Sequence, residues 1–122
     1  MEPGHFPLDV LIVEDDLIIA IDFEDRILSF GAKRVRTAAT VTAALAAIAE
    51  RAPDFALLDI DLIRETSFAI AERLDALDIP FIFVTGYGGE IGLPLAFAGR
   101  TRLEKPCLNE TLQQALRRRP SK

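Results

Sequence analysis

Residues 10–16 read Val-Leu-Ile-Val-Glu-Asp-Asp. An apolar run of four residues that ends in charge is typical of a strand buried on both faces. Similar runs occur at Phe55–Leu58 and Phe81–Val84. Weaker strands are expected at Arg34–Ala38 and at Arg100–Glu104. The chain therefore contains the strands of a largely buried sheet.

Segments of helical period lie between these strands. An alternation of strand and helix implies a parallel sheet that right-handed crossover helices cover on both faces. For a chain of this size we expect an α/β fold: a flavodoxin-like, three-layer α/β/α architecture with a five-stranded parallel sheet in the order 2-1-3-4-5. The expected helices are Leu17–Phe30, ended by Gly31; Val41–Arg51, capped by Thr40; Phe68–Leu77; and a last helix capped by Asn109.

The composition bounds the class of protein. A chain of 122 residues provides one domain, and we expect a tail at 1–7, a domain at 8–119 and no output domain. Fourteen basic and nineteen acidic residues give a net charge of -5, which argues against nucleic acid as a partner. The single cysteine, Cys107, excludes an internal disulfide, and no apolar run is long enough to span a membrane. A cytoplasmic protein is expected.

Polar side chains follow four of the expected strands. In the order 2-1-3-4-5 the carboxyl ends of these strands are neighbours, so their polar groups should converge on one edge of the sheet. Clustered carboxylates repel one another unless a cation neutralises them, and hard oxygen ligands suit Mg²⁺ or Mn²⁺. The residues concerned are Glu14 and Asp15 after the first strand, Asp59 and Asp61 after the third, Thr85 after the fourth and Lys105 after the fifth.

This arrangement permits attack by a carboxylate on phosphorus to give an acyl phosphate. Asp59 is the most central candidate, because it ends the middle strand between the other carboxylates and Lys105. The metal ion, the ammonium group of Lys105, the hydroxyl of Thr85 and the amides of the turn at Gly86 would stabilise the transition state.

Four blocks of the sequence resemble those of the receiver domain of two-component response regulators. They are Val10–Asp16; Phe-Ala-Leu-Leu-Asp-Ile-Asp-Leu at 55–62; Phe-Val-Thr-Gly-Tyr-Gly at 83–88; and Leu-Glu-Lys-Pro at 103–106. The resemblance spans residues 8–118. The segment at 81–88 is similar to a subgroup with a Phe-Ala-Thr-Gly-Tyr motif, whose members include stand-alone receivers in bacterial stress-response phosphorelays; here Val84 replaces the alanine.

The resemblance implies a role for each site residue. Glu14 and Asp15 become the acidic metal-binding pair, Asp59 the phosphoacceptor and a metal ligand, and Asp61 a ligand through its backbone carbonyl. Thr85 becomes the switch hydroxyl, with Gly86 beside it at the phosphate, and Lys105 the phosphate partner. The implied partners are a sensor histidine kinase or a histidine phosphotransfer protein, with Mg²⁺ as cofactor and no turnover of an external substrate.

The sequence departs from the receiver pattern at three places. Residues 62–66 replace the Pro-Gly segment that usually follows the phosphoacceptor loop, which leaves the conformation of this loop open. Arg102 stands where many receivers carry an aromatic switch residue, so Tyr87 is the candidate for a related role. Cys107 stands where the family often has Phe.

Simpler interpretations remain open for several residues. Asp15 or Asp16 could cap the helix that begins at Leu17, and the side chain of Asp61 could only shape a turn. His5 is expected to be exposed in the tail. Two other functions are considered: an interaction module with a receiver fold that is not phosphorylated, and a haloacid-dehalogenase-type phosphatase that uses Asp59-Ile60-Asp61. The phosphatase motif normally closes the first strand of a longer chain.

Overall fold

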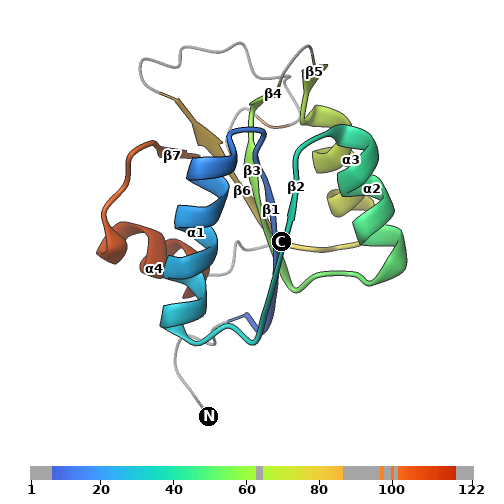
Figure 1. Ribbon diagram of the computed structural model, residues 1–122. Coiled ribbons are helices and arrows are strands. Elements are labelled where there is room, and N and C mark those ends of the chain that lie inside the picture. The colour runs from blue at the N-terminus through green and yellow to red at the C-terminus, as the bar shows by residue number, and fades with distance from the viewer. Residues whose placement is uncertain (1–6, 63–64, 87–96, 98–99, 101, 118–122) are drawn as a thin grey trace.

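Five parallel strands form one sheet in the order β2-β1-β3-β6-β7 (Figure 1). This computed structural model describes residues 7–62, 65–86, 97, 100 and 102–117. Counted along the chain within this sheet, the order is 2-1-3-4-5, as predicted. The strands are β1 (Asp9–Val13), β2 (Arg34–Ala38), β3 (Phe55–Asp59), β6 (Phe81–Thr85) and β7 (Arg102–Glu104).

Helices cover both faces of the sheet, with α1 and α4 on one face and α2 and α3 on the other (Figure 1). Where the predicted end of a helix or strand differs from the observed one, the difference is one or two residues. In the described part of the chain the helices are α1 (Leu17–Phe30), α2 (Val41–Glu50), α3 (Phe68–Ala76) and α4 (Asn109–Arg117). The structure therefore has the three layers that the alternation of strand and helix predicts.

The core is divided by the sheet into two apolar clusters. Successive strand residues point to opposite faces, so Leu11 and Val13 pack toward α2 and α3, while Val10 and Ile12 pack toward α1 and α4. All four of these side chains are at most 1% exposed. Strands with both faces covered must be apolar almost throughout, which is why β1, β3 and β6 read as continuous apolar runs.

Helix ends follow the predicted capping residues in α1 and α2. Asp16 caps α1 by accepting from the amides of Ile18 and Ile19, and Thr40 caps α2 by accepting from the amide of Ala43. Gly31 ends α1 with φ 123°, a backbone conformation that residues with a Cβ rarely adopt.

The start of α4 differs from the prediction. Asn109 is the first residue of the helix rather than its cap, and its side-chain oxygen accepts a hydrogen bond from Nε of Arg26 at 2.6 Å. A guanidinium group is charged and is therefore a stronger hydrogen-bond donor than a helix amide. Here it occupies the side-chain oxygen that would otherwise cap the helix. Asn109 therefore joins α4 to α1.

The loop after β3 contains a small element that the sequence did not predict. Strands β4 (Asp61–Leu62) and β5 (Glu65–Thr66) pair in an antiparallel hairpin before α3. The carboxylate of Glu65 accepts from the amide of Val41 at 3.0 Å, which ties this hairpin to the first turn of α2. Two-residue strands are too short to show a period of two, so the pattern gave no signal for them.

No helix in the described part of the chain is long and apolar enough to cross a membrane.

Candidate functional site

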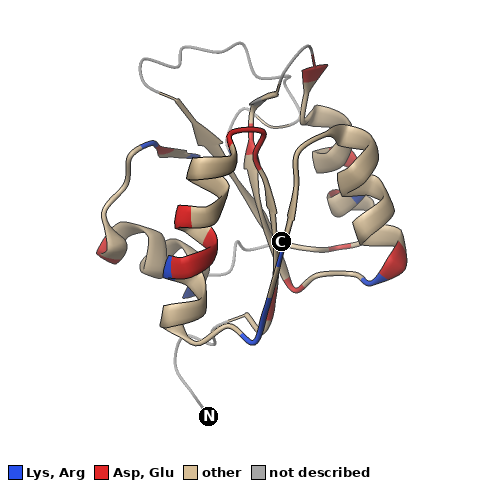
Figure 2. Cartoon of the chain, in the orientation of Figure 1, with Lys and Arg blue, Asp and Glu red and all other residues tan. Residues whose placement is uncertain are grey.

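The carboxyl edge of the sheet gathers the polar residues that follow the strands. Glu14 and Asp15 begin the loop between β1 and α1, and this loop is coloured as acidic in Figure 2. Asp59 is the last residue of β3, Thr85 is the last residue of β6, and Lys105 directly follows β7. Because β1, β3, β6 and β7 are contiguous in the sheet, these five residues lie along one edge of it.

Three carboxylates form the acidic part of the site. One oxygen from each of Glu14, Asp15 and Asp59 lies within 4.8 Å of the others. Glu14 and Asp59 are only 4% and 7% exposed, whereas Asp15 is half-buried and open to solvent on one side. A set of hard oxygen donors with one member near water matches the needs of Mg²⁺ or Mn²⁺, so the residues present fit such an ion.

The structure shows which of Asp15 and Asp16 caps α1, a question that the sequence left open. Asp16 is exposed and its carboxylate is used as the cap of α1. Its own amide donates to Oε2 of Glu14 at 3.0 Å, which helps to hold the buried Glu14 carboxylate in place. Asp15, rather than Asp16, belongs to the acidic cluster.

Lys105 provides the positive charge of the site. Its Nζ lies 2.8 Å from Oε1 of Glu14 and 3.4 Å from Oδ2 of Asp59. Burial lowers the pKa of Lys105, but the hydrogen bond to Glu14 and the negative charges of Asp59 and Glu14 outweigh that effect and raise the pKa above its ordinary value. The ammonium form is therefore firmly held between the two carboxylates.

The pKa of Asp59 is higher than is usual for an aspartate. Burial and the negative charge of Glu14 raise its pKa to about 7, although the ammonium of Lys105 acts in the opposite direction. Desolvation and a like charge both penalise the ionised form. A divalent cation among these carboxylates would offset both penalties and favour the carboxylate that a nucleophile requires.

Thr85 connects the site to the last strand. Its carbonyl accepts from the amide of Lys105 at 2.8 Å, so β6 holds the main chain of Lys105 directly. Its hydroxyl donates to the carbonyl of Gly86 at 3.3 Å, and the residue is only 3% exposed. Val84 pairs with Asp59 across the sheet, which places Thr85 one residue beyond the level of the carboxylate.

Other predicted site residues are only partly described. Asp61 begins β4 two residues after Asp59, and its side chain lies outside the described set. Tyr87, the switch candidate, and His5 also lie outside the described residues. Arg102 is exposed on β7, and the peptide bond between Lys105 and Pro106 is cis.

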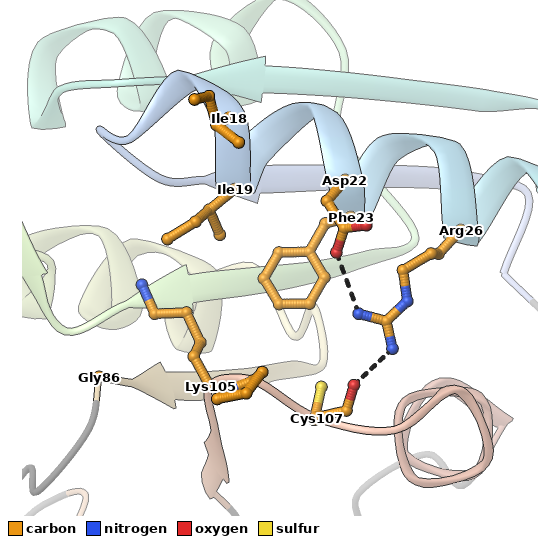
Figure 3. Close-up of a pocket in the computed structure, with 9 residues that line it drawn as sticks. Ile18, Ile19, Asp22, Phe23, Arg26, Gly86, Lys105 and Cys107 are labelled. Atoms are coloured by element: carbon orange, nitrogen blue, oxygen red, sulfur yellow. Dashed lines mark hydrogen bonds and ion pairs between the residues drawn. The ribbon is translucent and has the colours of Figure 1, made fainter.

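A pocket of about 530 Å³ opens beside Lys105 (Figure 3). Side chains of α1, among them Ile19, Phe23 and Arg26, form one wall, and the segment from Lys105 to Cys107 forms another. Arg26 is not among the site residues predicted from the sequence. The only local signal was its spacing of four residues from Asp22, with which it forms an ion pair at 3.2 Å.

Comparison with solved structures places this geometry among known proteins. The solution structure of SdrG from Sphingomonas melonis Fr1 is 38% identical, with a TM-score of 0.78 over 88% of this chain and 92% of that one. The receiver (REC) domain of the PhyR response regulator from Erythrobacter litoralis is 32% identical, with a TM-score of 0.72 over 94% of each chain. A comparison with curated proteins found no match.

The family model for the response regulator receiver domain matches residues 10–117, which include all the strands of the central sheet except Asp9 and all four helices described above. A match of this extent agrees with the sheet order and with the placement of Asp59 at the end of the middle strand. The chain therefore belongs to the response regulator receiver domain family of two-component signalling.

Proposed function

We propose that this chain is a single-domain phosphoryl switch, in which Asp59 accepts a phosphoryl group from a histidine kinase or a histidine phosphotransfer protein. The observation that carries the proposal is the buried carboxylate of Asp59 with the Lys105 ammonium 3.4 Å away and two further carboxylates beside it. Such a set supplies a nucleophile, a cation for the developing charge and ligands for a metal ion.

The reaction transfers the phosphoryl group from nitrogen to oxygen. An oxygen of the Asp59 carboxylate attacks phosphorus, the bond from phosphorus to the donor imidazole nitrogen breaks, and that nitrogen keeps the electron pair. The product is an aspartyl phosphate. Glu14, Asp15, Asp59 and the backbone carbonyl of Asp61 would hold Mg²⁺, which when bound neutralises charge on the carboxylates and on the phosphoryl oxygens.

Lys105 and Thr85 would stabilise the transferred group. The ammonium of Lys105 already lies between Glu14 and Asp59, so a short movement brings it to a phosphoryl oxygen on Asp59. The hydroxyl of Thr85, which donates to the Gly86 carbonyl in this structure, can turn to donate to another phosphoryl oxygen. The amide of Gly86 is a further donor.

Partner proteins are proposed to supply and read the phosphoryl group. Exposed apolar side chains lie a few residues from the site along the chain. Leu17 and Ile18, at the start of α1, are 70% and 78% exposed, and Leu108, just before α4, is 73% exposed. Large apolar side chains exposed beside a reactive group support contact with a protein donor. One similar structure is that of the PhyR stress response regulator, which is 31% identical over 91% of this chain and 43% of that one. We propose that this chain acts in a stress response, in a cytoplasmic phosphorelay.

Mass spectrometry of the intact protein after incubation with Mg²⁺ and acetyl phosphate tests the proposal. We expect the gain of one phosphoryl group by the wild type and by Asp25→Asn, which changes an exposed carboxylate of α1, and no gain by Asp59→Asn. Absence of the gain in the wild type, or its persistence in Asp59→Asn, would contradict the proposal.

We further propose that the chain does not turn over an external substrate. Asp59 ends the third strand along the chain, β3, whereas the phosphatases that share an Asp-x-Asp motif carry it after the first strand. A steady release of p-nitrophenol from p-nitrophenyl phosphate that Asp59→Asn abolishes would instead establish a phosphatase.

A further inference from the structure

Arg26 of α1 holds the chain segment that follows Lys105. Its Nη2 donates to the carbonyl of Cys107 at 2.6 Å, and its Nε donates to the side-chain oxygen of Asn109 at 2.6 Å. These acceptors lie two and four residues beyond Lys105. One guanidinium group therefore fixes the main chain just after the lysine (Figure 3). It also fixes the first residue of α4.

The guanidinium group also has contacts within α1. Its third nitrogen, Nη1, donates to the carboxylate of Asp22 at 3.2 Å, and its central carbon lies 5.8 Å from the centre of the Phe23 ring. The side chain of Arg26 is 18% exposed, compared with 59% for Asp22. The helix that carries it is anchored on the sheet by the buried side chains of Ala20, Phe23 and Ile27.

This arrangement completes a connection between the sheet and the main chain of Lys105. On one side the amide of Lys105 donates to the carbonyl of Thr85 at 2.8 Å. On the other side the segment leaves the sheet, and Arg26 ties it to α1 through Cys107 and Asn109. The long side chain of a lysine reaches a defined point only when its main chain is fixed at both ends.

We propose that Arg26 is a positioning residue that keeps the Lys105 ammonium within reach of Asp59, and that it acts on phosphoryl transfer only through Lys105. This inference rests on the proposed function. A planar fork with three occupied nitrogens sets the distance and direction of the segment, which a lysine at this position cannot do. Displacement of a charge-stabilising group by about 1 Å can cost up to about 100-fold in rate.

The test measures the rate of Asp59 phosphorylation by acetyl phosphate at saturating Mg²⁺, well below the melting temperature of each variant. We expect Arg26→Ala to slow the reaction by about 5- to 50-fold. In the Lys105→Ala background, the same change should alter the residual rate by less than about twofold, because the group that Arg26 positions is gone. An equal loss in both backgrounds would overturn the proposal.

Arg36 offers a matched control at the opposite end of the sheet. Its side chain is 19% exposed, pairs with Asp9 at 3.1 Å, and donates to the carbonyls of Ala47 and Arg51 at 2.9 and 2.8 Å. We expect Arg36→Ala to lower stability and to leave the phosphorylation rate within about twofold of the wild type. An equal slowing by Arg36→Ala would show a general effect of destabilisation and overturn the proposal.

Arg26→Lys separates charge from geometry, since it keeps the charge and loses the fork. We expect its rate to resemble that of Arg26→Ala, and full activity in Arg26→Lys would contradict the positioning role. A wild type that gains no phosphoryl group would instead overturn the proposed function. A wild type that is phosphorylated at the same rate as Arg26→Ala would overturn only the inference about Arg26.

Discussion

Two opposing influences act on the carboxyl group of Asp59. Burial and Glu14 favour its protonated form, while Lys105 favours the carboxylate, and the pKa is raised to about 7. Between pH 3.8 and about 7 the folded chain therefore holds a proton that the unfolded chain has released. The contribution of Asp59 to the free energy of unfolding therefore falls as the pH rises through this window, since the ionised group is less stable in the fold than in water.

The pH dependence of stability checks this reasoning. In the presence of EDTA, Asp59→Asn should raise the free energy of unfolding at pH 8 by about 1–3 kcal/mol, and it should have a smaller effect at pH 4. Urea unfolding at both pH values measures the difference, with Asp25→Asn as the control for a lost surface charge. An equal effect of Asp59→Asn at pH 4 and pH 8 would contradict a raised pKa.

Lys105 competes with a metal ion for the same carboxylates. It donates to Glu14 and lies near Asp59, both of which belong to the acidic cluster. Lys105→Met should therefore tighten Mg²⁺ binding by about 3- to 10-fold, because a positive charge close to the ion is removed. The same variant should slow phosphorylation by more than about 100-fold.

Isothermal titration calorimetry with MgCl₂ measures the first effect, and acetyl phosphate kinetics measure the second. Lys33→Met, which removes an exposed lysine before β2, is the control for the change in net charge. Weaker binding of Mg²⁺ by Lys105→Met would indicate that the ion does not share these carboxylates with the lysine.

At the scale of elements, the residues that precede α1, α2 and α3 are all of types that commonly cap helices, but only two of them do so. Asp16 and Thr40 have extended backbones, with ψ of 112° and 165°, and their side chains accept from amides of the first turn. Ser67 precedes α3 with ψ 11°, makes no side-chain cap, and is fully buried. Within the described part of the chain its hydroxyl has no hydrogen-bond partner. An extended backbone is what directs a capping side chain back to the helix amides.

Alanine substitutions should reveal this difference. Asp16→Ala is expected to lower the free energy of unfolding by about 1 kcal/mol, because it leaves helix amides without an acceptor. Ser67→Ala is expected to be neutral or to stabilise by up to about 1 kcal/mol, since it removes a buried polar group that is not satisfied. Urea unfolding measures both values. A loss of more than about 1 kcal/mol in Ser67→Ala would show that its hydroxyl is used.

At the scale of the whole molecule, the fold keeps like charges together at one edge of the sheet. Two apolar clusters, one on each face, hold the strands in register and so hold Glu14 and Asp59 close to each other. Local repulsion between these groups is a cost that the packing of the whole domain must offset. A ligand that binds only the folded arrangement should therefore stabilise the entire domain.

Mg²⁺ should raise the melting temperature at pH 8. At a concentration ten times the dissociation constant, binding to the native state alone adds about 1.4 kcal/mol, which corresponds to several degrees for a domain of this size. Differential scanning calorimetry in MgCl₂, compared with NaCl of equal ionic strength, measures the shift. Asp15→Asn should abolish most of it. A shift of the same size in Asp15→Asn would place the ion elsewhere.

Much of the fold and of the site could be predicted because the signals are local. Short stretches of chain are enough to identify the apolar run at 10–13 and the carboxylates after it. The same is true of Asp59 at the end of β3 and of Lys105 after β7. Once the strand order follows from the alternation of strand and helix, the ends of neighbouring strands must meet. The convergence of these residues could therefore be predicted without knowledge of any side-chain contact.

The sequence by itself thus determined the layers, the strand order and the residues that gather at the edge of the sheet. The packing of the helices against the sheet was needed to show that Asp16 caps α1, and that Asn109 binds Arg26 instead of capping α4. Arg26 reaches acceptors 81 and 83 residues away, and Lys105 reaches Glu14 across 91 residues. Such partners depend on how α1 packs against the sheet, and no local period or spacing encodes that packing.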